Sequence, residues 1–82
     1  MRRILMGTAQ CHDLPVRYYL LAKAREDETE TYGIGVEYAG ERVEIPNITP
    51  FQHRIQKLVE TLISGLVTPA TLVDVTEDWL LT

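Results

Sequence analysis

The amino-acid sequence predicts a small α+β protein, in which a three- to four-stranded antiparallel sheet (a meander) is followed by two helices packed on one face. Three observations support this fold. The 82 residues allow one domain. Apolar residues alternate with a period of two in the first half of the chain, and they recur with helical spacing in the second half. We therefore expect a single domain over residues 1–82, with strands at about 2–8, 16–24, 32–38 and 41–45 and helices at about 50–64 and 69–81.

The predicted strands have clear patterns and clear ends. In residues 32–38, Tyr32, Ile34, Val36 and Tyr38 share one face, and such β-branched and aromatic residues at a period of two are typical of a strand. Ala39-Gly40 then predicts a tight turn, because Gly40 is free to take a positive φ. Pro46 is expected to end the last strand, since proline cannot donate to a ladder.

The two helices have matching start signals. Thr49-Pro50 and Thr68-Pro69 each place a hydroxyl at the N-cap and a proline at the first helical position. Gly65 is expected at the C′ position that ends the first helix. The predicted core joins sheet residues to helix residues, namely Tyr18, Leu20, Ile34 and Val36 with Phe51, Ile55, Leu58, Leu62, Leu72, Val75 and Trp79.

Charge and cysteine content limit the partners and the cellular compartment that we expect for the protein. The chain has 8 basic and 12 acidic residues and a net charge of −4, which disfavours binding to nucleic acid or to an anionic membrane surface. No apolar stretch approaches the roughly 20 residues that a membrane span needs. A lone cysteine, Cys11, forms no intrachain disulfide and favours the reducing cytoplasm. We expect neither nucleic acid nor membrane as a partner.

The most reactive stretch is Cys11-His12-Asp13, followed by Leu14-Pro15. A thiol nucleophile needs a base within hydrogen-bond reach, but neighbours in an extended segment point to opposite sides. We therefore interpret the triplet as a turn between strands. The carboxylates of Asp74, Glu77 and Asp78 are typical of the solvated face of an amphipathic helix. The sequence thus predicts no catalytic residue, no metal ligand and no cofactor.

The second face of the sheet is the candidate interface, and it comprises Arg17, Tyr19, Leu21, Gly33 and Gly35. These residues are too apolar for open water and too polar for a core, and two closely linked helices cover one side of the sheet alone. We expect a partner protein, a second copy of the chain or the first strand to cover this face, with the glycines permitting close approach. Tyr19→Glu or Leu21→Asp should then weaken association and leave the fold intact.

Four segments of the chain carry a resemblance to a known family. They are Tyr18-Tyr19-Leu20-Leu21, Tyr32-Gly33-Ile34, Ile45-Pro46-Asn47-Ile48-Thr49 and residues 67–80, where Thr68-Pro69, Leu72, Asp74, Val75, Asp78 and Trp79 are the most specific. Over about residues 16–81 the chain resembles a family of small uncharacterised proteins, a domain of unknown function from low-GC Gram-positive bacteria. The resemblance implies a bacterial, cytoplasmic, single-domain protein and no activity.

These observations favour a small non-enzymatic module for protein interaction, with an accessory or regulatory role and a capacity to form a homodimer. Two alternatives remain open. One is a small enzyme or enzyme subunit that uses Cys11 or a carboxylate cluster. The other is a nucleic-acid-binding module that depends on Arg17, Lys23, Arg54 and Lys57.

Overall fold

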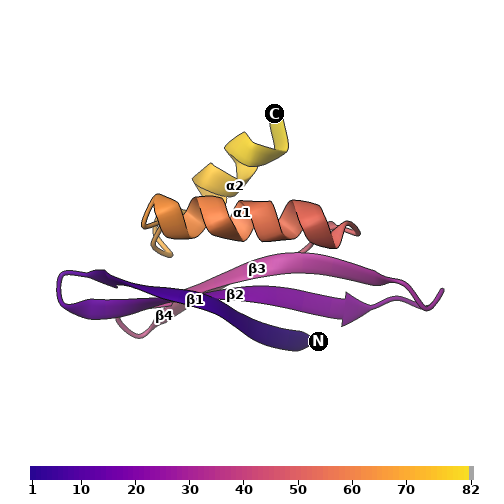
Figure 1. The fold of residues 1–82 in the computed structure, drawn as a ribbon, viewed down its shortest axis with the longest axis horizontal. Coiled ribbons are helices and arrows are strands. Elements are labelled where there is room, and N and C mark those ends of the chain that lie inside the picture. Colours follow the sequence, from indigo (N-terminus) through magenta and orange to yellow (C-terminus); the bar gives the residue numbers. More distant parts are fainter. Residues whose placement is uncertain (82) are drawn as a thin grey trace.

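The computed structural model describes residues 1–81. Over these residues the chain forms an antiparallel sheet of four strands in the order β1-β2-β3-β4, followed by two helices (Figure 1). The strands are β1 (Arg2–Cys11), β2 (Leu14–Ala24), β3 (Glu30–Tyr38) and β4 (Glu41–Thr49), and the helices are α1 (Gln52–Ser64) and α2 (Leu72–Leu81). The α+β meander expected from the sequence is confirmed.

The turn between β1 and β2 is shorter than the sequence indicated, whereas the turn between β3 and β4 is the predicted Ala39-Gly40. His12-Asp13 joins β1 to β2 and Ala39-Gly40 joins β3 to β4, and all four residues have positive φ. Two-residue turns of this conformation match the twist of the flanking strands, so pairing continues up to the turn. For this reason the predicted end of the first strand at residue 8 and start of the second at residue 16 are wrong. Cys11 pairs with Leu14 directly beside the turn.

Pro46 does not end β4, which continues to Thr49. A proline is tolerated there because β4 is an edge strand and pairs with β3 on one side. The register shifts between Tyr32 and Ile34, and Asn47 has a φ of 58° in the same irregular stretch. The predicted strand end at residue 45 is therefore wrong by four residues, because a bulge accommodates the proline.

The start of α1 differs from the predicted capping arrangement. Thr49 is the buried last residue of β4, and its hydroxyl accepts a hydrogen bond of 3.2 Å from the Phe51 backbone N–H. Phe51 occupies the N-cap, where no side chain caps the helix. Because its side chain is 61% exposed, the prediction that Phe51 belongs to the core is wrong. The helix begins at Gln52, after the proline.

The end of α1 is displaced by one residue from the sequence prediction. Gly65 is the C-cap with a φ of −87°, and Leu66 takes the left-handed conformation at C′ with a φ of 50°. The N–H groups of Val67 and Leu66 donate to the carbonyls of Leu62 and Ile63, which is a Schellman arrangement. The prediction that Gly65 lies at C′ is therefore wrong by one residue. The hydrogen bonds that end the helix place Leu66, and not the glycine, in the left-handed conformation.

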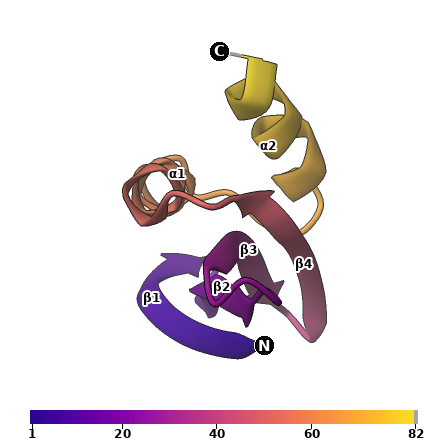
Figure 2. The same ribbon diagram turned by 90° about the vertical axis from the view of Figure 1, so that its right-hand side faces the viewer.

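The second helix begins at Leu72 and not at residue 69. Thr68 and the following residues form a turn, in which the Thr71 N–H donates to the Thr68 carbonyl over 3.1 Å. Figure 2 shows α2 rising away from the sheet beyond its first turn. Accordingly Leu72 is fully buried, whereas Val75 and Trp79 are half-buried at the margin of the core.

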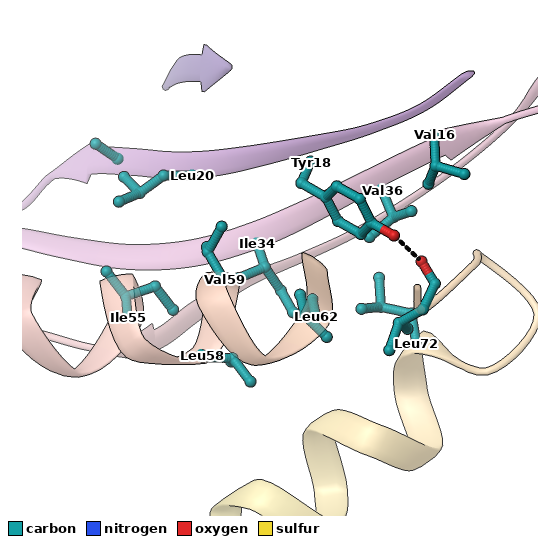
Figure 3. Packing of buried hydrophobic residues seen from close by; sticks show 12 residues of the cluster. Val16, Tyr18, Leu20, Ile34, Val36, Ile55, Leu58, Val59, Leu62 and Leu72 are labelled. Carbon is teal, nitrogen blue, oxygen red and sulfur yellow. Dashed lines mark hydrogen bonds between the residues drawn. The ribbon is translucent and has the colours of Figure 1, made fainter. Parts of the chain in front are cut away.

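The core lies between the sheet and α1 (Figure 3). Its fully buried side chains are Val16, Tyr18, Ile34 and Val36 from the sheet and Ile55, Leu58 and Leu72 from the helices, with Leu20, Val59 and Leu62 almost as enclosed. The Tyr18 hydroxyl donates a 2.9 Å hydrogen bond to the Val67 carbonyl, which holds the linker between the helices against the sheet. This core contains the predicted residues apart from Phe51 and the marginal Val75 and Trp79, and it also includes Val16 and Val59.

Candidate functional site

The second face of the sheet, opposite α1, is crossed by an ion pair between its two edge strands. The Arg3 guanidinium of β1 makes two contacts, of 2.5 and 3.0 Å, with the Glu44 carboxylate of β4. In a flat sheet the outer strands of a four-stranded set lie about 14 Å apart, too far for these side chains to meet comfortably. The pair therefore requires a sheet that curls over this face.

Two glycines of β3 make room for that curl. A Cβ on Gly33 would lie 2.2 Å from the Ile45 carbonyl oxygen and 2.6 Å from the Pro46 Cα. A Cβ on Gly35 would lie 3.4 Å from the Glu44 Cγ. The sequence predicted that these glycines permit a close approach, and the element that approaches them is β4 of the same chain.

The curl covers much of the candidate interface. Leu21 is 1% exposed, and Gly33 and Gly35 are buried, whereas Tyr19 is half-buried and Arg17 is exposed. The expectation that Leu21→Asp leaves the fold intact is therefore wrong, because the change would bury a carboxylate without a partner. Whether Arg17 and Tyr19 meet another molecule stays a prediction.

The charged end of the same face is a cross-strand triad. Glu37 on β3 lies between Arg17 and Arg42, at 3.3 Å and 2.7 Å from their guanidinium nitrogens. The Arg42 hydrogen bond, assisted by the charge of Arg17, lowers the pKa of the Glu37 carboxyl. Arg3 lowers the pKa of Glu44 in the same way. Each of these charges has a partner of opposite sign within the chain, so the ion pairs stabilise the curled sheet.

The outer edge of β1 is the feature that sequence reasoning missed. Within the described residues β1 pairs with β2 and with no other strand. Ile4, Leu5 and Met6 are consecutive and exposed on it, and Leu5 is 52% exposed beside its cross-strand neighbour Tyr19. The sequence did contain a signal, because the first strand of a meander is an edge strand and residues 2–11 contain no proline.

The two sheet edges differ in how well they resist pairing. The β4 edge contains Pro46, a register shift and the charged residues Glu41, Arg42 and Glu44, all of which discourage strand addition. On β1 the charged residues are Arg2 and Arg3, and both form ion pairs with carboxylates of their own chain, Glu30 and Glu44. The central part of the β1 edge is therefore apolar and open.

The residues considered as a catalytic or metal site, Cys11, His12 and Asp13, have structural roles at the turn between β1 and β2. Cys11 is half-buried at the end of β1, and its carbonyl accepts a 3.1 Å hydrogen bond from the Tyr38 hydroxyl. His12 and Asp13 form the exposed turn, as the sequence predicted. Among residues 1–81 the structure forms no group of three or more His, Cys, Asp or Glu side chains that could hold a metal ion.

The four basic residues considered for nucleic-acid binding do not form one patch. Arg17 lies on the second face and is paired with Glu37. Arg54 and Lys57 lie on α1, across the sheet from Arg17, and the Arg54 guanidinium sits 5.0 Å from the centre of the Trp79 ring. Lys23 lies near the end of β2, beside a depression of about 500 Å³. That depression includes one buried polar side chain, Thr49, which is already hydrogen-bonded to the Phe51 N–H.

Comparison with family models gives a match over residues 4–82 to a family of unknown function, DUF6514. The chain belongs to DUF6514. No curated protein and no solved structure matches it. The resemblance to an uncharacterised family is thereby confirmed, and the DUF6514 match extends farther toward the N-terminus than the residues 16–81 expected from the sequence.

The DUF6514 match includes nearly all of β1 together with the other elements of the fold. The edge that carries Ile4, Leu5 and Met6 thus belongs to the region that the family shares. Within residues 1–81 neither helix is long and apolar enough to cross a membrane.

Proposed function

We propose that this protein is a non-enzymatic interaction module that binds other polypeptides through the outer edge of β1. One observation carries the proposal: three consecutive apolar side chains, Ile4, Leu5 and Met6, are exposed on a strand that has a second side available for pairing. An open strand edge supplies backbone donors and acceptors for an added strand, and the flanking side chains supply apolar contacts. The lone free cysteine fits a reducing compartment such as the cytoplasm, where such an accessory or regulatory module would act.

The second face contributes to the same surface. Leu5 pairs with Tyr19 across β1 and β2, so an added strand at the β1 edge would contact Leu5, which has this tyrosine as its neighbour on the other side. Tyrosine combines a large apolar ring with a polar end, and it is enriched at protein interfaces. Of the residues first considered for an interface, Tyr19 is therefore the one that this proposal retains, as the neighbour of Leu5.

A capture experiment with matched variants tests the proposal. The immobilised protein is exposed to native lysate as wild type, as Leu5→Lys and as Leu80→Lys, since both leucines are about equally exposed at 52% and 54%. We expect the wild type and Leu80→Lys to retain the same polypeptides, further copies of the chain included, and Leu5→Lys to lose them. Equal retention by all three proteins would contradict binding through β1.

A further inference from the structure

We infer that the occupant of the β1 edge is a second copy of this chain, paired β1 to β1 in an antiparallel, two-fold symmetric dimer. This inference rests on the proposed function and names its partner. Such pairing is isologous, because the same edge serves both copies, and it joins the two sheets into one continuous sheet. It also removes both open β1 edges from solvent, which leaves the β4 edges, with Pro46, at the two ends.

The register of this pairing follows from the irregularity in β1. Ile4 pairs with Leu20 and Gly7 pairs with Tyr18, and both partners belong to the core, so Ile4 and Gly7 lie on the same face of β1. They do so although three positions separate them, because Met6 is an extra residue at the register shift between Leu5 and Gly7.

Residues paired across two antiparallel strands lie on one face of the sheet. With the two-fold axis between Leu5 and Met6, the pairing that satisfies this rule sets Ile4 of one copy opposite Gly7 of the other. It likewise sets Arg3 opposite Thr8. The exposed Ile4 side chain of one copy then lies beside Gly7 of the other, next to the Ile63 side chain that packs over this glycine. The apolar segments of the two strands meet at the centre of the dimer, as a stable core for the interface requires.

Charge favours the antiparallel arrangement over a parallel one. Arg2 and Arg3 are the charged residues of β1, and both lie at its start. Parallel pairing would stack the arginines of the two copies, whereas antiparallel pairing places several residues of the strand between them. The arginines of each copy then lie beside the small and neutral residues Thr8, Ala9 and Gln10 of the other.

The C-terminal end of α1 provides a complementary charge. Figure 1 shows α1 running in the same direction as β1, and Ile63 lies over Gly7, with its Cδ1 2.9 Å from where a glycine Cβ would be. The last turn of α1, residues 61–64, has no basic residue to offset the negative end of the helix dipole. Antiparallel pairing brings Arg2 of the second copy opposite Ala9, next to this helix end.

Light scattering on the intact protein tests the inference. At tens of micromolar we expect the wild type and Leu80→Lys to have the mass of a dimer, and Leu5→Lys to have the mass of a monomer, with its dissociation constant raised at least tenfold. Circular dichroism checks that both variants fold. A monomeric wild type, or a dimer that Leu80→Lys disrupts and Leu5→Lys does not, would overturn the inference.

Disulfide trapping supplies a readout that does not depend on the lysine variants. In a Cys11→Ser background, Leu5→Cys places a thiol beside the two-fold axis, so mild oxidation should link two chains covalently. Leu80→Cys in the same background should stay unlinked. Equal cross-linking of the two variants would also overturn the inference. If the wild type is monomeric but retains a different protein through Leu5, the proposed function stands and the self-pairing fails.

Discussion

Gly33 is the position at which the curl of the sheet can be tested most sharply. A Cβ there would lie 2.2 Å from the Ile45 carbonyl oxygen and 2.6 Å from the Pro46 Cα, and both atoms are backbone. Ordinary contacts need about 1 Å more, so Gly33→Ala must push β4 away from β3. Overpacking typically costs about 1–3 kcal/mol when side chains give way, and we expect about 3 kcal/mol or more against backbone. This is a large part of the 5–15 kcal/mol typical of a domain.

Gly35→Ala is the matched control, because its Cβ would meet the flexible Glu44 side chain at 3.4 Å. We expect that change to cost less than about 1 kcal/mol, since the carboxylate end can shift in solvent. Urea unfolding followed by circular dichroism measures both variants against the wild type. If Gly33→Ala had the wild-type midpoint, or the two variants were equally destabilised, the close crossing of β4 over Gly33 would be refuted.

Three further predictions concern particular groups. Tyr18→Phe should lower the unfolding free energy by about 1–3 kcal/mol in urea titration, because it leaves the buried Val67 carbonyl without its 2.9 Å hydrogen bond; an unchanged midpoint would contradict this. Thr76→Val should raise the free energy of unfolding by about 1 kcal/mol and the melting temperature with it, since within the described residues the buried Thr76 hydroxyl lacks a hydrogen-bond partner. A lower melting temperature would refute the view that this hydroxyl is unpaired. Because the pKa of Glu44 is lowered from its ordinary value of 4.5, the ionised carboxylate stabilises the fold above pH 4.5, and this contribution is lost as the pH falls through the pKa of the folded protein. Glu44→Gln should therefore make the free energy of unfolding fall less steeply in acid. An unchanged acid profile would show that the pair with Arg3 contributes nothing.

Local patterns in the sequence predicted the elements and most of the core. Alternation placed Tyr18, Ile34 and Val36 on the buried face, and helical spacing did the same for Ile55 and Leu58. These predictions succeeded because the period of apolar residues directly reflects which side of an element faces the interior. The four-stranded meander followed because neighbouring strands with short turns pair in sequence order.

The errors arose where distant contacts override local signals. Thr49 has the sequence signature of a helix cap, but pairing of β4 with β3 extends the strand through it. Leu21 was expected at an outer face because alternation cannot reveal that Arg3 and Glu44 close over that face. The open edge of β1 was missed for a different reason: its place as the first strand of the meander indicated it, but alternation alone does not show which strand edge stays unpaired.

Hydrogen exchange at two protein concentrations tests the pairing of β1 most directly. The backbone amides of β1 that point away from β2 should be protected at tens of micromolar and should lose that protection on dilution, while amides of the β4 edge exchange equally at both concentrations. The pairing predicts this contrast because it engages one sheet edge and leaves the other in solvent. Exchange from β1 that is fast and independent of concentration would contradict it.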